Sequence, residues 1–127
     1  MFTRKSISAA PLAKNLSDMA YVPEAGDVVW FQFSRQADDD EQPERQLAVV
    51  LSPAAYNRIG LMLCCPLTIK LKGYPFEVLL TGSKPRAALA DQVKSLDWRA
   101  IRVRRNGKVT DDELAEIRAK VRALIGK

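Results

Sequence analysis

The sequence contains no histidine at all, and it contains only two cysteines, Cys64 and Cys65. The absence of histidine excludes acid–base chemistry and metal sites that depend on an imidazole, and two cysteines alone do not make a zinc site. Any catalysis must therefore use arginine, lysine, threonine, serine, tyrosine, aspartate or glutamate side chains. We expect neither a metal nor a cofactor.

The two cysteines are adjacent in the chain. Neighbouring side chains of a strand point to opposite faces, so a disulfide between Cys64 and Cys65 is not favoured. We expect both to be small, buried, apolar residues of a protein in a reducing compartment, and hence a cytoplasmic protein.

Long hydrophobic runs are absent as well, and no stretch is long and apolar enough to span a membrane. The first twenty residues are basic and rich in small residues, but they lack the apolar centre of a signal peptide. We therefore expect a protein without a membrane span, in which residues 1–22 form a flexible N-terminal arm and residues 23–127 form a single domain.

The charge of the chain is unevenly distributed. Residues 1–45 carry 5 basic and 8 acidic side chains, whereas residues 46–127 carry 15 basic and 7 acidic side chains. A basic body favours a polyanionic partner, either a nucleic acid or an acidic protein segment. A basic protein with a merely solvated charged face is the alternative that composition leaves open.

Short apolar segments separated by turns predict a mainly β domain. In the first segment Val29 and Phe31 alternate with Val28 and Trp30, as expected for a strand with two different faces. Ser52 is expected to cap a short helical turn over residues 53–58. Strands are predicted over residues 26–34, 46–52, 60–68, 76–80 and 87–90, with a basic strand or hairpin over 99–109 that turns at residues 106–107.

The C-terminal segment predicts a helix with clear limits. Residues 110–113, Thr-Asp-Asp-Glu, form a capping box, and Gly126 is suited to the end of the helix. Leu114, Ile117, Val121 and Leu124 form one apolar stripe, which either the sheet or a partner subunit must cover. Many short strands and one helix predict a small, strongly bent sheet or partly open barrel.

One loop carries an unusual density of polar side chains. Residues 64–78 read CCPLTIKLKGYPFEV, which places Thr68, Lys70 and Lys72 between two apolar strands. A solvated hairpin accounts for this pattern, and so does a site that holds, and can cut, a chain of phosphates.

Four strings, GDVVWF, AVVLSPAAYN, KGYPFEV and LADQVKSLDWRA, follow one another in the order typical of one family. From about residue 23 onward the sequence resembles the MazF/PemK family of toxin endoribonucleases. The resemblance implies a small SH3-like barrel with a C-terminal helix, the plasmid-maintenance toxin fold of the CcdB/MazF type, working as a homodimer. It also implies metal-independent, sequence-selective cleavage of single-stranded RNA, and an acidic, MazE-like antitoxin whose disordered segment covers the RNA groove.

In the family, a threonine at the end of the third strand and an arginine at the start of the second carry the cleavage. Thr68 matches the threonine because it lies four residues before Lys72-Gly73. The position of the arginine holds Gln46, and Arg45 lies one residue earlier. A shift of one residue turns a side chain to the opposite face of a regular strand.

Three readings follow from this shift: a bulge re-aims Arg45, another basic residue takes its place, or the activity is weak. We favour Arg45 as the functional residue. Its role is to stabilise the phosphate, because a guanidinium titrates too high to be an easy base at neutral pH.

The resemblance also implies a catalytic assistant and a set of RNA contacts. Glu41 falls where the family has an acidic residue, which can orient an arginine or assist proton transfer, although a solvated charge fits equally. Trp30 and Trp98 fit either base stacking or core packing. The candidate RNA-binding residues are Lys70, Lys72, Tyr74, Gln92 and Lys94.

Two rival functions remain open at this point. The first is a catalytically weakened relative that binds RNA or antitoxin without efficient cleavage, and Gln46 is the feature in its favour. The second is a gyrase-poisoning toxin on the same barrel, which the strings KGYPFEV and LADQVKS disfavour.

Overall fold

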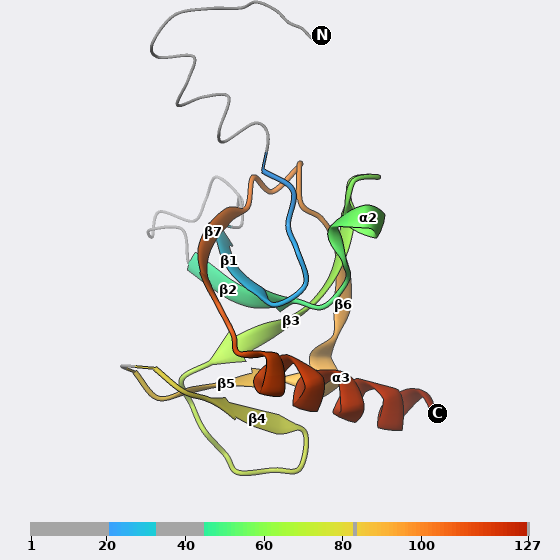
Figure 1. Ribbon diagram of the computed structural model, residues 1–127. Helices are drawn as coiled ribbons and strands as arrows, with labels where there is room; N and C mark the ends of the chain where they lie inside the picture. The colour runs from blue at the N-terminus through green and yellow to red at the C-terminus, as the bar shows by residue number, and fades with distance from the viewer. Residues whose placement is uncertain (1–20, 33–44, 83, 127) are drawn as a thin grey trace, which may run out of the picture.

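The computed structural model describes residues 21–32, 45–82 and 84–126. The predicted catalytic assistant Glu41 and the first twenty residues of the predicted arm lie outside these ranges. The elements are β1 (Asp27–Gln32), β2 (Arg45–Val50), α2 (Ala54–Asn57), β3 (Leu61–Thr68), β4 (Glu77–Leu80), β5 (Arg86–Leu89), η1 (Ala90–Gln92), β6 (Lys94–Asp97), β7 (Arg104–Lys108) and α3 (Asp111–Ile125) (Figure 1).

The strands form one antiparallel sheet in the order β4-β5-β3-β2-β1-β7, and β6 pairs with β3. β3 joins the parts of this sheet because its residues 61–64 pair with β6, residues 64–66 with β2 and residues 67–68 with β5. The sheet bends along β3, so that β1, β2 and β7 curl above β4, β5 and α3 in the view of Figure 1. The predicted fold, a small, partly open β-barrel with a C-terminal helix, is confirmed.

Two hydrophobic cores lie on the two faces of the sheet. Val28 and Val29 are adjacent in β1 but belong to different cores, and the same holds for Cys65 and Cys64 in β3. The inner core consists of Val28, Val49, Leu51, Cys65, Val78, Ala88, Ala90, Val109, Ile117 and Val121. The outer core consists of Val29, Phe31, Ala48, Val50, Met62, Cys64 and Trp98.

The cysteines behave as the sequence predicts. Both are free thiols, and both are buried. Burial raises the pKa of the Cys64 thiol to about 11, and burial together with its neighbour raises the pKa of Cys65 to about 12. Both thiols are therefore neutral at neutral pH, which disfavours a role as a nucleophile.

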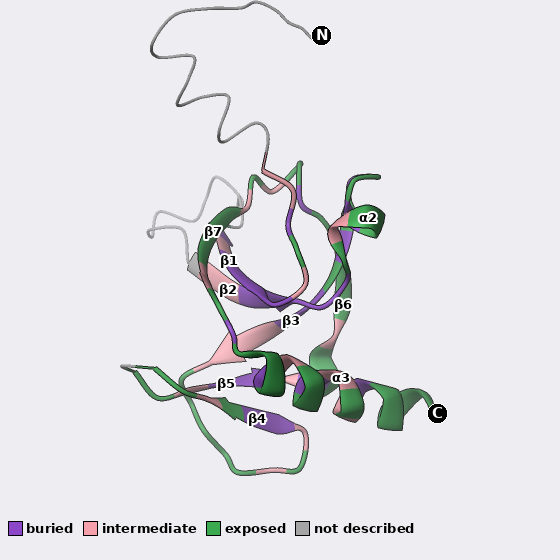
Figure 2. Ribbon diagram, in the orientation of Figure 1, coloured by how far each residue is buried: buried purple, intermediate pink, exposed green. Residues whose placement is uncertain are grey.

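The C-terminal helix α3 begins and ends as predicted. The Glu113 amide donates to Thr110 Oγ1 at 3.0 Å, and the Thr110 amide donates to the Glu113 carboxylate at 2.8 Å. Gly126 ends the helix with a left-handed φ of 91°. Ile117 and Val121 are buried in the inner core, so the barrel itself covers the middle of the stripe, whereas the outward face of α3 is exposed (Figure 2).

Glu113 also ties α3 to the sheet. Its carboxylate accepts hydrogen bonds from the Thr81 amide at 2.7 Å and from the Thr81 hydroxyl at 3.0 Å. Burial by itself would raise the pKa of Glu113, but the hydrogen bonds from Thr110 and Thr81 outweigh it and lower the pKa. The charged carboxylate is thus the form that holds the start of α3 beside the end of β4.

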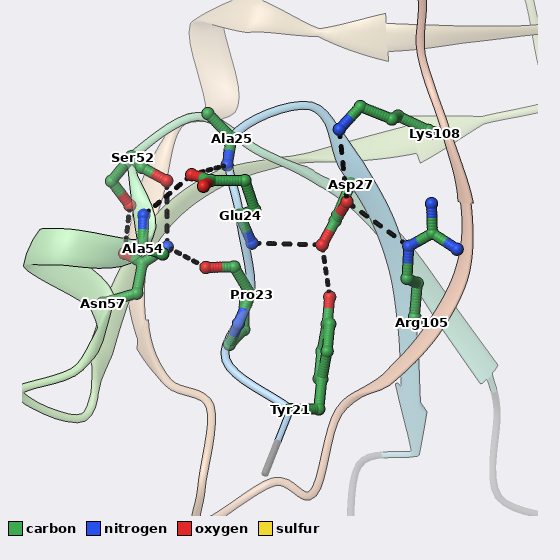
Figure 3. A network of polar contacts seen from close by, with 10 residues as sticks. All are labelled: Tyr21, Pro23, Glu24, Ala25, Asp27, Ser52, Ala54, Asn57, Arg105 and Lys108. Carbon is green, nitrogen blue, oxygen red and sulfur yellow. Dashed lines mark hydrogen bonds and ion pairs between the residues drawn. The ribbon is translucent and has the colours of Figure 1, made fainter. Parts of the chain in front are cut away.

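The fully buried Asn57 lies at the centre of a network of hydrogen bonds (Figure 3). The Asn57 amide group donates to the carbonyls of Pro23 at 2.8 Å and Ser52 at 2.9 Å, and its Oδ1 accepts from the Ser52 hydroxyl at 2.6 Å. The Asn57 carbonyl accepts from Trp98 Nε1 at 2.7 Å. Every polar group of the Asn57 cluster (Pro23, Ser52, Asn57 and Trp98) named here has a partner, as burial requires.

The start of β1 is held by a buried carboxylate (Figure 3). Asp27 accepts from the Tyr21 hydroxyl at 2.6 Å and from the Glu24 amide at 3.0 Å, and it lies 3.4 Å from Arg105 and 3.9 Å from Lys108. The pKa of Tyr21 is raised, mainly by burial and to a smaller extent by the hydrogen bond to Asp27. The chain just before β1 is therefore fixed against β7.

The predicted turn at residues 106–107 is wrong. β7 runs straight through this dipeptide and pairs with β1. Val28 faces Gly107 and Val29 faces Arg105, so Asn106 is the extra residue of a β-bulge. An Asn-Gly pair fits an irregular strand as well as a turn, and pairing with β1 decides between them.

Two further elements differ from the predictions. β6 was missing from the predicted strands because its four residues alternate too briefly to give a signal. The N-terminal cap of α2 is Pro53, which makes no side-chain hydrogen bond, so Ser52 is not the cap. Ser52 instead binds Asn57 and accepts from the Leu63 amide at 2.8 Å, which joins α2 to β3.

Candidate functional site

An open groove of about 510 Å³ lies where β2 begins, β3 ends and β5 begins. These three chain positions are distant in the sequence, and β3 brings them together because it pairs with both β2 and β5. The groove is lined by Gln46, Leu47, Leu67, Thr68, Ile69, Lys70 and Arg86. Its composition combines apolar walls with one hydroxyl, one amide and two cations.

Thr68 is the hydroxyl of the groove. It is the last residue of β3, and it pairs with the fully buried Ala87 of β5, so its backbone is fixed. Thr68 Oγ1 accepts a hydrogen bond from the Lys70 amide at 3.0 Å. Because that bond uses the oxygen as an acceptor, the hydroxyl proton remains available to donate to a ligand in the groove.

Gln46 lies in the same groove, at the position where the family resemblance calls for arginine. Ala48 faces Pro66 at the end of the β2–β3 ladder, and Gln46 and Thr68 each lie two residues beyond that pair. The β1–β2 ladder is regular through the pairs of Phe31 with Gln46 and Gln32 with Arg45. That pairing contains no bulge to re-aim Arg45, whose side chain lies outside what the structure describes.

Two cations line the groove, Lys70 and Arg86. Lys70 was singled out from the sequence, whereas Arg86 was missed. Arg86 follows the turn TGSKP and belongs to none of the recognised strings, so no local pattern marks it. Its proximity to Thr68 comes from the pairing of β5 with β3, which a single sequence does not reveal.

The loop after Thr68 is held by two carboxylates. The amides of Lys72 and Gly73 both donate to the Glu77 carboxylate at 2.8 Å, and Gly73 adopts a left-handed φ of 73°. The Tyr74 hydroxyl donates to Asp91 at 2.7 Å, and this bond raises the pKa of Tyr74 to about 12. These bonds tie the loop backbone to Glu77 and the Tyr74 side chain to Asp91, while the Lys72 side chain is exposed.

The remaining candidates, Lys72, Tyr74, Gln92 and Lys94, do not line the groove. Tyr74 is bonded to Asp91, the neighbour of Gln92, which sets the loop beside η1. Lys94 is exposed and pairs with Cys64, four residues before the end of β3. Gln46, Thr68 and Lys70 are thus brought together, whereas Lys72, Tyr74, Gln92 and Lys94 form an outer set.

The two tryptophans have different environments. Trp98 is only 7% exposed and its Nε1 is bonded to the Asn57 carbonyl, so core packing is its role and base stacking is excluded. Trp30 is half-buried, and the Arg104 guanidinium lies 6.0 Å from the centre of its ring.

Within the described part of the chain, no group of three or more histidine, cysteine, aspartate or glutamate side chains is placed to hold a metal ion. None of the helices formed by those residues is long and apolar enough to cross a membrane.

A small, half-open barrel with a C-terminal helix and a basic groove beside a strand-end hydroxyl defines a protein suited to bind a chain of phosphates. The sequence profile of the family described as "PemK-like, MazF-like toxin of type II toxin-antitoxin system" matches residues 24–125. The chain belongs to this family.

Individual relatives agree with that assignment. The chain is 48% identical over 108 residues to the endoribonuclease toxin MazF of Escherichia coli (strain K12), covering 84% of this chain and 96% of the relative. The crystal structure of MazE–MazF (Form-III) from Deinococcus radiodurans is similar with a TM-score of 0.74 and 47% identity, covering 84% of this chain and 98% of that one.

MazF alone (Form-I) from Deinococcus radiodurans is similar with a TM-score of 0.72 and 49% identity over 84% of this chain and 99% of that one. The Mycobacterium tuberculosis toxin MazF-mt6 is 11% identical with a TM-score of 0.59, covering 78% of this chain and 95% of that one, and it shares the fold alone.

Proposed function

We propose that this chain is the toxin of a type II toxin–antitoxin system and that it cleaves single-stranded RNA at selected sequences without a metal ion. The observation that carries the proposal is the 48% identity to an endoribonuclease toxin over 96% of that relative's length. The groove that holds Thr68, Lys70 and Arg86 is the place where the geometry supports this chemistry best.

The reaction suits a protein without histidine because the substrate supplies its own nucleophile. The ribose 2′-oxygen attacks phosphorus, the bond from phosphorus to the 5′-oxygen breaks, and the products are a 2′,3′-cyclic phosphate and a 5′-hydroxyl. The proton of the 2′-hydroxyl must leave and the 5′-oxygen must gain one. The protein mainly positions the phosphate and stabilises the negative charge that builds on it.

Thr68 donates its free hydroxyl proton to a phosphate oxygen in this proposal. Arg45 stabilises the phosphate, and Glu41 orients an arginine or assists proton transfer. The outer set, with Lys70, binds the RNA strand: the lysines contact phosphates, Tyr74 contacts a base or sugar, and Gln92 reads a base edge. The excess of basic residues after residue 45 supports such a partner.

The partners follow from the family. MazE–MazF complexes are among the similar solved structures, which supports an acidic, MazE-like antitoxin for this chain. Leu124 and Ile125 at the end of α3 are 46% and 76% exposed, and this apolar surface supports a homodimer. The two buried free thiols support a cytoplasmic location.

The test is an incubation of the purified protein with long single-stranded RNA in excess EDTA, followed by mapping of the fragment ends. We expect discrete fragments with 2′,3′-cyclic phosphate ends. Thr68→Val removes the hydroxyl at nearly constant volume and should abolish the fragments, whereas Thr68→Ser keeps the hydroxyl and should retain cleavage.

RNA that is bound but remains intact would reject the nuclease proposal in favour of the catalytically weakened relative. Equal cleavage by the Thr68→Val variant would leave the nuclease standing but remove Thr68 from its mechanism.

A further inference from the structure

We propose that Arg86 is a catalytic residue whose guanidinium binds the scissile phosphate beside Thr68. It would add, from β5, a fixed positive charge to the one proposed for Arg45, in a groove whose lining on β2 includes the neutral Gln46. The inference rests on the proposed RNA cleavage and adds to it a residue that lies outside the strings shared with the family.

The position of Arg86 is set by two strand pairings. Arg86 begins β5 and faces Leu80 of β4, and the next residue, Ala87, directly faces Thr68 of β3. Arg86 therefore lies one residue along β5 from the partner of Thr68, a step of about 3.3 Å. In a regular ladder this one-residue step would turn Arg86 to the face opposite Thr68. Both residues nevertheless line the same groove, where β3 ends and β5 begins, so a phosphate in that groove can meet the hydroxyl and the guanidinium together.

The charge of Arg86 has no carboxylate partner in the described ranges. The ion pairs there, those of Arg105 and Lys108, both go to Asp27. Arg86 is half-buried, and a partly desolvated guanidinium without a counterion is unfavourable unless an anion binds to it. A phosphate is the anion that the planar donor fork of arginine fits best, through two parallel hydrogen bonds.

The other groove residues do not match this role. Lys70 is exposed, and its ammonium is a strongly hydrated point charge without a fixed donor geometry. Gln46 carries an amide that can donate a hydrogen bond but cannot neutralise charge. Among the described residues that line the groove, Arg86 is the one that combines partial burial with a permanent charge.

A donor that strengthens its contact as charge builds on the phosphate affects the chemical step more than RNA binding. Removing one such donor lowers the rate by about 100-fold to 1,000-fold in enzymes that stabilise an oxyanion. We therefore expect the rate at saturating RNA to fall by about 100-fold in Arg86→Ala, with RNA affinity reduced by less than about tenfold.

The experiment measures single-turnover cleavage of a short single-stranded RNA that contains one cleavage site, together with the affinity of each variant for that RNA. Arg86→Ala should respond to added guanidinium chloride at millimolar concentration with partial recovery of the rate, and the same salt as sodium chloride should give none. Arg86→Lys keeps the charge without the fork and should lose about tenfold. Lys84→Ala is the matched control, because Lys84 is an exposed cation two residues away that does not line the groove, and it should stay within about twofold.

The outcomes separate this inference from the proposed function. If the unmodified protein cleaves and Arg86→Ala cleaves within about threefold of it, the inference is overturned while the nuclease stands. If only the affinity falls and the rate at saturation is unchanged, Arg86 binds RNA without acting in catalysis, and the inference is again overturned. If the unmodified protein does not cleave at all, the proposed function and the inference fail together.

A folding defect would not obscure the result. Only folded molecules can recover activity with added guanidinium, and the Arg86→Lys variant gives a second measurement with a charged side chain at the same position. A loss of cleavage in Arg45→Ala combined with normal cleavage in Arg86→Ala would leave Arg45 as the arginine that acts on the phosphate and would overturn the inference.

Discussion

The Asn57 cluster and the groove contain similar kinds of side chain but treat them in opposite ways. In the Asn57 cluster an amide, a hydroxyl and an indole N–H are buried, and each has a hydrogen-bond partner within the fold. In the groove an amide, a hydroxyl and two cations face an open hollow of about 510 Å³. The first region uses its polar groups to hold chain segments together, while the second keeps them available.

Whether a polar side chain is paired within the fold or faces the open groove distinguishes structural polar residues from candidate functional ones. Burying an unpaired polar group costs free energy, so a polar group that is buried and paired reports on stability. A half-buried cation that has no counterion among the described residues, such as Arg86, is instead a candidate for binding a ligand. Substitutions in the two regions should therefore change different measured quantities.

The largest effect on stability is expected for Asn57→Ala. The change removes the donor to the Pro23 and Ser52 carbonyls and the acceptor of the Ser52 hydroxyl, which should lower the free energy of unfolding by about 3 kcal/mol. Urea denaturation followed by tryptophan fluorescence measures it. Asn106→Ala is the control, because Asn106 is exposed in the bulge of β7 and should change the free energy of unfolding by less than about 0.5 kcal/mol.

A smaller effect of the same kind is expected for Trp98→Phe. The ring remains to fill the outer core, but the Asn57 carbonyl loses the hydrogen bond from Nε1, at a cost of about 1.5 kcal/mol. Unfolding by guanidinium chloride followed by circular dichroism measures it. A loss above that of Asn57→Ala would show that ring packing, rather than the polar contact, dominates this region.

A pH-dependent effect of about 1 kcal/mol is expected for Glu113→Gln, which weakens the capping box of α3 and the bond to Thr81. The hydrogen bonds lower the pKa of Glu113 in the folded chain, so its contribution is present above the ordinary pKa of 4.5 and is lost as the pH falls through the folded pKa. Melting temperatures of the two proteins should differ at pH 7 and converge in acid. A constant difference across that range would contradict the role of the charge.

The smallest effect on stability is expected for Thr68→Val, in the groove. The hydroxyl accepts one bond from the Lys70 amide at the end of a strand, so the free energy of unfolding should change by less than about 0.5 kcal/mol. Denaturation in urea, compared with the cleavage assay on the same preparation, tests this. A destabilisation as large as that of Asn57→Ala would mean that Thr68 belongs with the structural polar residues.

Local patterns predicted the parts of the fold that depend on neighbours in the sequence. Val28 and Val29 alternate between two cores, Cys64 and Cys65 do the same, and Thr110 forms the predicted capping box with Glu113. The failures concern pairings over long distances. The dipeptide at 106–107 became a bulge because β1 pairs with both of its sides, and β6 exists because β3 leaves an edge for it.

The same limit applies to the groove. The resemblance led to Thr68 and Gln46 because each lies in or beside a shared string, and the structure brings both into one lining. Arg86 lies in none of the shared sequence strings and in no periodic pattern of apolar residues. Only the pairing of β5 with β3 brings it close to Thr68. A residue that reaches the site from a neighbouring strand can be predicted from the sequence only when the pairing of the strands is already known.

The shared strand β3 has a consequence for the motions of the groove. Its middle residues, Cys64 and Cys65, are buried and both pair with β2, and Cys64 also pairs with β6, so their amide protons should exchange with deuterium only when the whole chain unfolds. Thr68 ends this strand, and the loop beyond it is open to solvent. The Thr68 hydroxyl thus lies at the boundary between a strand with slowly exchanging amides and an exposed loop, in which the amides of Lys70, Lys72 and Gly73 are bonded only to side chains.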